Sequence, residues 1–129
     1  MRSRAAVVLR WTSLLVYAVF LFLVSSRPLP DVPIPPIRHL DKVAHAGAYC
    51  LFAILCFRAF RTDDDRPTPV WVLLVGVTLA TLYGTAQEFY QDTVPYRTFD
   101  WIDLISNSAG AGIAAMIWEP LTARYRWLR

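Results

Sequence analysis

Four long apolar runs, each with few charged residues, dominate the sequence. They cover about residues 5–24, 41–60, 70–90 and 100–118. A helix needs about 20 residues to cross the hydrocarbon core of a bilayer, and each run has about this length. The nine prolines lie between or beyond the runs, which agrees with helices because proline breaks helix interiors. The pattern therefore predicts an all-α fold, with one membrane domain of four transmembrane helices.

Composition narrows the class of protein further. Hydrophobic residues make up 56% of the 129 residues and charged residues only 18%, whereas soluble domains carry about 25% charged residues. This composition excludes a disordered chain, and two cysteines are too few for a disulfide scaffold. The net charge is +3, but the basic residues cap apolar runs and form no stripe. We therefore expect no nucleic-acid partner.

The basic residues predict how the helices cross the membrane. With a cytoplasmic N-terminus, nine arginines lie in the inner segments, and the outer loops hold four basic residues: Arg27, Arg38, Lys42 and Arg97. This bias favours an N-in and C-in orientation. We interpret the first run as a span, because it is long for a signal core and no Ala-x-Ala follows it. The alternative is a cleaved signal peptide, since basic residues precede the run and Val24-Ser25-Ser26 resembles a weak cleavage site.

Polar residues collect where the second run begins, the third ends and the fourth begins. These residues are Asp41, Lys42, His45, Tyr49, Glu88, Gln91, Arg97, Asp100, Asp103 and Asn107. Spacings of three and four residues place each set on one helical face. Because successive helices run in opposite directions, the three sets share one membrane depth. A charge in lipid costs at least about 2.5–3.5 kcal/mol, so we expect one polar site just under the outer surface.

The same residues carry a resemblance to a known family. Their blocks read Asp41-Lys42-x-x-His45-x-x-x-Tyr49, then Tyr83-Gly84-x-x-x-Glu88-x-x-Gln91, then Pro95-x-Arg97-x-x-Asp100-x-x-Asp103-x-x-x-Asn107-x-x-Gly110. In this order and spacing they resemble the VanZ-like family, over about residues 29–118. The resemblance implies a small multi-pass protein of the bacterial inner membrane. The founding member of the family is linked to low-level resistance to the glycopeptide teicoplanin, and the resemblance implies no established reaction.

The predicted site holds more acids than bases. Its carboxylates are Asp41, Glu88, Asp92, Asp100 and Asp103, and its bases are Lys42 and Arg97. Three outcomes are open: some carboxyls stay protonated, a divalent metal binds to His45, Glu88 and Asp103, or Arg27, Arg38 or His39 neutralises the site. The groups can also be ion pairs that only fix the bundle. Buried ion pairs are a poor source of stability, however, so the whole set favours a functional site.

Two functions fit these residues. The first is an accessory cell-envelope protein that binds an anionic lipid headgroup or a lipid-linked, peptidoglycan-precursor-like ligand. Its ligand-binding candidates are Asp41, Lys42, Tyr49, Gln91, Arg97, Asp100 and Asn107, with Arg97 suited to a phosphate or carboxylate. The second is a membrane-embedded hydrolase or transferase acting on an envelope lipid, with Glu88, His45 and Asp103 as hypothetical catalytic residues, with or without a metal. An ion pathway ranks last because the inner half of the helices lacks acids, and the sequence indicates no oligomeric state.

Overall fold

The computed structural model describes residues 4–27, 39–62, 67–95 and 97–125. It contains four helices, α1 (Arg4–Ser25), α2 (Leu40–Phe60), α3 (Val70–Gln91) and α4 (Trp101–Arg124), and no strand within the described residues. Helices α1, α2 and α3 are each long and apolar enough to cross a membrane. The prediction of an all-α membrane protein is therefore confirmed for the helical fold and for three membrane-like helices.

The fourth helix continues beyond the predicted end at residue 118. Pro120 lies inside α4, although its ring nitrogen cannot donate the usual backbone hydrogen bond. Tertiary contacts compensate, because the buried Trp118 donates from Nε1 to Thr68 Oγ1 at 2.8 Å and packs edge-on against Phe57. These contacts hold the last turns of α4 against α2 and the α2–α3 connection, so the helix ends only at Arg124.

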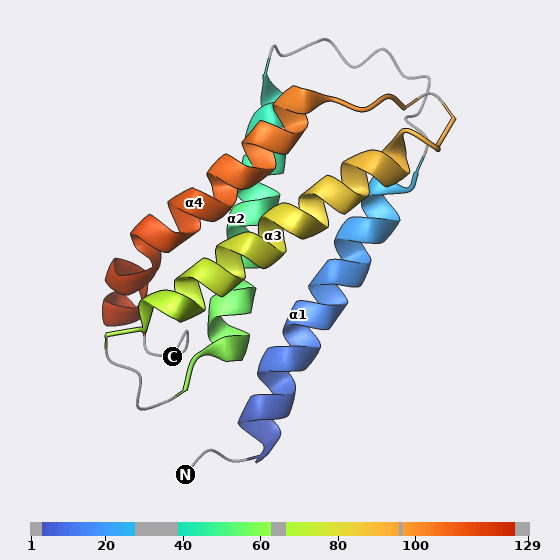
Figure 1. Cartoon of the computed structure of the whole chain (residues 1–129). Helices are drawn as coiled ribbons and strands as arrows, with labels where there is room; N and C mark the ends of the chain where they lie inside the picture. The colour runs from blue at the N-terminus through green and yellow to red at the C-terminus, as the bar shows by residue number, and fades with distance from the viewer. Residues whose placement is uncertain (1–3, 28–38, 63–66, 96, 126–129) are drawn as a thin grey trace.

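Helix α2 lies at the centre of the bundle. It packs most extensively on α4 and also contacts α3 and α1, whereas α1 lies at the edge and touches α3 only slightly (Figure 1). The start of α2, the end of α3 and the start of α4 lie at one end of the bundle, together with the end of α1 (Figure 1). We call this the polar end, because the antiparallel order of the helices brings the predicted polar residues to it.

The close contact between α2 and α4 requires a glycine at position 110. A Cβ there would collide with the backbone carbonyl of Ala46, whereas a Cβ at Gly112 would meet no neighbouring atom of the described chain within 4 Å. Gly110 lies between Ser106 and Ala114 in a row of small residues spaced four apart, a pattern that lets membrane helices approach closely. This contact sets the separation of the polar side chains of α2 and α4, which lie about one turn nearer the polar end.

The outer surfaces of the helices are strongly apolar. Large exposed side chains include Leu15, Phe20, Leu51, Leu74, Leu82 and Ile105. Soluble monomers rarely expose large continuous apolar patches, whereas lipid chains contact such side chains at no hydrophobic cost. The exposed surface thus agrees with the hydropathy of the helices.

Candidate functional site

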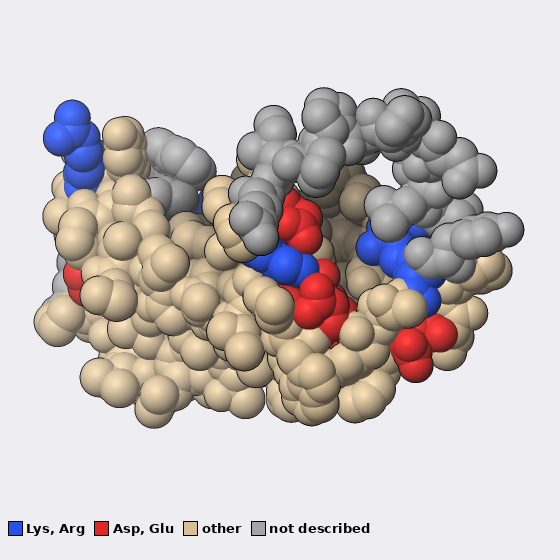
Figure 2. Space-filling view, turned by 90° about the horizontal axis from the view of Figure 1, so that it is seen from above, with Lys and Arg blue, Asp and Glu red and all other residues tan. Residues whose placement is uncertain are grey.

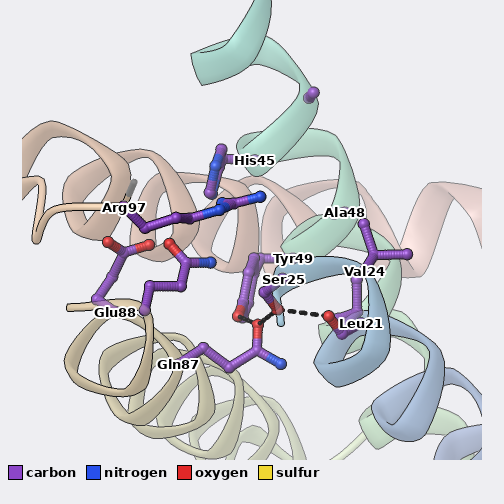
Figure 3. Close-up of a pocket in the computed structure, with 11 residues that line it drawn as sticks. Leu21, Val24, Ser25, His45, Ala48, Tyr49, Gln87, Glu88 and Arg97 are labelled. Carbon is purple, nitrogen blue, oxygen red and sulfur yellow. Dashed lines mark hydrogen bonds between the residues drawn. The ribbon is translucent and has the colours of Figure 1, made fainter. Parts of the chain in front are cut away.

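A cavity of about 200 Å³ lies at the polar end, among α1, α2, α3 and the α3–α4 connection. Arg97 and Glu88 lie on one side of it, and Leu21, Val24 and Ala48 lie on the other (Figure 3). Seen from this end, basic and acidic side chains lie on two sides of a hollow (Figure 2). The remaining lining residues are Ser25, Ala44, His45, Tyr49, Gln87 and Gln91. The pocket is therefore two-sided, with a charged wall opposite an apolar one.

Lys42 organises the carboxylates at the rim of the pocket. Its Nζ donates to Asp100 Oδ2 at 2.6 Å and to Asp103 Oδ1, and lies 3.0 Å from Asp41 Oδ2. Asp100 also caps α4, because its Oδ1 accepts a hydrogen bond from the backbone N–H of Ile102 at 2.7 Å. The hydrogen bond from Lys42 has the larger effect, and together with the bond from Ile102 it holds the pKa of Asp100 below its ordinary value. Asp41 is 61% exposed and so lies at the outside of this cluster.

His45 is oriented by Asn107. His45 Nδ1 lies 3.0 Å from Asn107 Oδ1. An amide oxygen only accepts hydrogen bonds, so with the amide in this orientation Nδ1 is the donor. The other ring nitrogen, Nε2, faces Asp103 Oδ2 at 3.5 Å. If the imidazole is neutral and Nδ1 carries its proton, the lone pair of Nε2 faces Asp103 Oδ2.

Glu88 is almost completely buried, with 1% of the residue exposed. Its Oε2 lies 3.5 Å from the backbone nitrogen of Asp100, at the limit of a hydrogen bond. One ligand atom from each of His45, Glu88 and Asp103 lies within 4.8 Å of the other two. The three residues that the sequence singled out as possible metal ligands therefore share one small volume beside the pocket.

Arg97 reaches from the α3–α4 connection over the pocket (Figure 3). Its Nε is buried and has no hydrogen-bond partner in the described part of the chain, and the same holds for Gln87 Nε2 and Asn107 Nδ2. A buried donor without a partner costs about 1–3 kcal/mol. Arg97 Nε is thus positioned to gain free energy from an acceptor that enters the pocket.

The structure adds Ser25 and Gln87 to the residues that the sequence singled out. Tyr49 Oη and Ser25 Oγ both donate to Gln87 Oε1 at 2.9 Å, and all three residues line the pocket with Gln91. The position of Gln87 directly before Glu88, in a mainly apolar helix, was an available signal. Ser25 gave none, because the first run is distinguished only by its hydrophobicity.

Two residues considered from the sequence lie away from the pocket. Asp92 is exposed, accepts a hydrogen bond from the backbone N–H of Phe99 at 3.2 Å and does not line the pocket. His39 is exposed and precedes α2 with a φ of 78°. Arg38 lies outside the described residues.

The sequence profile described as VanZ/LLP1 matches residues 5–123 of the chain. The chain belongs to the VanZ/LLP1 family. The match includes α1, which the sequence motifs do not cover. An uncharacterized protein of Schizosaccharomyces pombe is 31% identical over 103 residues, which are 79% of this chain and 61% of the relative. No solved structure matches the chain.

Proposed function

We propose that this VanZ/LLP1 protein binds the headgroup of an anionic membrane phospholipid in the pocket at its polar end. The observation that carries the proposal is the two-sided lining of the pocket. Leu21, Val24 and Ala48 face one side of it, and Arg97 with its unpartnered Nε covers the other. An amphipathic ligand matches both sides, with its phosphate at Arg97 and the start of its acyl chains along α1 and α2.

Arg97 is the residue best suited to hold the phosphate. Its planar guanidinium can donate two parallel hydrogen bonds to phosphate oxygens. Lys42 is less available, because its ammonium group already contacts Asp41, Asp100 and Asp103. We therefore assign phosphate binding to Arg97 and assign Lys42 to holding the starts of α2 and α4 together.

The fungal relative supports a phospholipid over a peptidoglycan precursor. Both ligands offer a phosphate, so Arg97 alone does not distinguish them. A fungus makes no peptidoglycan, and the similarity to the S. pombe protein covers 79% of this chain. A ligand that fungal membranes also contain is the simpler choice for the family, and a role with peptidoglycan precursors or in glycopeptide resistance becomes an outcome of the test.

We further propose that α4 is a fourth span and that the end of the bundle opposite the polar end, where α1 starts and α4 ends, is cytoplasmic. At 24 residues, α4 is about 36 Å long at 1.5 Å per residue, enough to cross a bilayer. Its polar residues lower its hydropathy, but Asn107 is buried against the bundle while Ile105 and Ile113 face outward. The excess of arginines on the sequence segments at that end supports a cytoplasmic location.

Single-cysteine labelling tests this topology. After replacement of Cys50 and Cys56 by alanine, we introduce Thr93→Cys at the polar end or Tyr125→Cys at the other end, both at exposed positions. In intact cells, a membrane-impermeant maleimide is expected to label Thr93→Cys and not Tyr125→Cys, which reacts only after permeabilisation. The cysteine-free protein is the control. Labelling of both positions in intact cells would contradict a fourth span.

Lipid binding by the purified protein tests the proposed function. We expect short-chain phosphatidylglycerol to bind the wild-type protein in detergent, and Arg97→Ala to weaken this binding about tenfold or more, because hydrogen bonds to charged groups contribute about 1.5–3 kcal/mol. Calorimetric titration measures the affinity. Arg97→Lys is expected to be intermediate, since it keeps the charge and loses the planar fork.

Arg27→Ala is the matched control, because Arg27 is an exposed arginine at the same end that does not line the pocket. Equal binding by Arg97→Ala and Arg27→Ala would refute the assignment to Arg97. Tighter binding of a soluble peptidoglycan-precursor analogue than of phosphatidylglycerol would favour the other ligand class. Mass spectrometry of the lipid after incubation tests the enzymatic alternative, in which Glu88 or His45 acts as a base, because a binding protein leaves the lipid intact.

A further inference from the structure

We infer that His45, Glu88 and Asp103 bind one divalent transition-metal cation beside the pocket. One ligand atom of each residue lies within 4.8 Å of the others. Ligand atoms about 2.1 Å from a metal lie up to about 4 Å apart, so small side-chain rotations bring all three into coordination range. One imidazole nitrogen and two carboxylate oxygens form a donor set suited to zinc, manganese or iron.

The orientation of His45 is an independent observation that points to a cation. Asn107 Oδ1 accepts a hydrogen bond from Nδ1, with 3.0 Å between the two atoms, and metal-binding histidines typically make such an outer contact through their second ring nitrogen. The other ring nitrogen, Nε2, faces Asp103 Oδ2 at 3.5 Å. A metal ion that takes the place of a proton between these two atoms contacts both of them.

The charge balance of the site also calls for a cation. Four carboxylates lie at the polar end close to the pocket or Lys42: Asp41, Glu88, Asp100 and Asp103. The basic side chains of the site among the described residues are Lys42 and Arg97, so the carboxyl groups outnumber the basic groups by two. Lys42 contacts Oδ1 of Asp103 and leaves Oδ2 on the side of His45. A divalent cation at His45, Glu88 and Asp103 neutralises the excess without displacing Lys42.

The metal site completes the phosphate site, and this part of the inference rests on the proposed function. An anionic headgroup would otherwise enter a pocket with excess negative charge. His45, Glu88 and Arg97 all line that pocket, so a cation held by three protein ligands keeps open positions toward it. The phosphate then contacts the metal on one side and Arg97 on the other. Metal binding itself needs no lipid and is tested without one.

The experiment measures uptake of Mn²⁺ by metal-stripped protein in lipid-free detergent. The wild-type chain is expected to retain about one ion after desalting, as measured by elemental analysis. His45→Asn is expected to lower the affinity for Mn²⁺ at least tenfold, because removing even an outer-shell partner of a metal costs about 10–100-fold. His39→Asn is the matched control, since His39 is exposed, lies six residues before His45, and occupies a left-handed conformation that asparagine tolerates.

A spectroscopic measurement keeps the test decisive if a variant fails to fold. Electron spin echo spectra of Mn²⁺ bound to the wild-type protein are expected to show coupling to one imidazole nitrogen. No retained ion in folded wild-type protein, a bound ion without nitrogen coupling, or equal affinity in His45→Asn and His39→Asn would overturn the metal site. Retained Mn²⁺ in a protein that fails to bind phosphatidylglycerol would support the metal site and refute only the proposed function.

Discussion

Replacing Gly110 by alanine is expected to destabilise the bundle by about 1–3 kcal/mol, the usual cost of adding a methyl group to a closely packed contact. The new Cβ would collide with the backbone carbonyl of Ala46. A backbone carbonyl in the middle of α2 cannot rotate away as a side chain can, so the whole of α2 has to move from α4. The measurement is unfolding by added denaturing detergent, followed by the fluorescence of the five tryptophans.

Gly112→Ala is the matched control for this prediction. A Cβ at Gly112 meets no described atom within 4 Å, and alanine favours a helix over glycine by up to about 1 kcal/mol. We therefore expect Gly112→Ala to be neutral or slightly stabilising. If Gly110→Ala unfolds at the same detergent fraction as Gly112→Ala, the close approach of α2 and α4 at Ala46 is wrong.

The same displacement is expected to affect the site. Asn107 lies about one turn before Gly110, and its hydrogen bond to His45 joins α4 to α2. Moving the helices apart lengthens this contact, so Gly110→Ala should lose Mn²⁺ affinity even under conditions in which it stays folded. A residue that touches no ligand thus determines the geometry of the site.

The helices and the clustering of polar residues were predictable from the sequence, because the free-energy cost of placing unsatisfied polar groups in lipid determines both. Within the bilayer, backbone N–H and C=O groups need hydrogen-bond partners in the protein, and charged side chains need partners inside the bundle. Apolar runs of about 20 residues therefore become helices, and Glu88 and Asp103, far apart in sequence, meet at one depth. The antiparallel order of the helices then brings them together, as the structure shows.

Contacts that depend on helix rotation and side-chain choice were not predictable. Lys42 had several carboxylates within reach by spacing, and only the packing of α2 on α4 selects Asp100 and Asp103 over Glu88. The extension of α4 past Pro120 depends on Trp118 meeting Thr68, a contact between distant segments. Ser25 enters the pocket because α1 lies against α2, a position that hydrophobicity alone leaves undetermined.

Replacing Lys42 by methionine is expected to destabilise the polar end, because Lys42 contacts three carboxylates there. It leaves Asp41, Asp100 and Asp103 with no ammonium group, and breaking a fully buried ion pair costs about 3–5 kcal/mol. Lys42 is 20% exposed, so solvent screening reduces the loss below this range. Arg27→Met is the control, because Arg27 is exposed at the same end and its loss is expected to change stability little.

The pH dependence of this difference tests its electrostatic origin. Contact with Lys42 is the main reason that the pKa of Asp100 lies below its ordinary value, so the stabilisation is present above that ordinary value and is lost as pH falls through the lowered one. The gap in unfolding free energy between wild-type protein and Lys42→Met is therefore expected to be largest near neutral pH and to narrow below about pH 4.

Adding Asp103→Asn to Lys42→Met removes one of the unpaired charges and should recover part of the loss at neutral pH. A gap that stays constant with pH, with no recovery in the double variant, would mean that Lys42 acts through packing of its side chain and not through its charge.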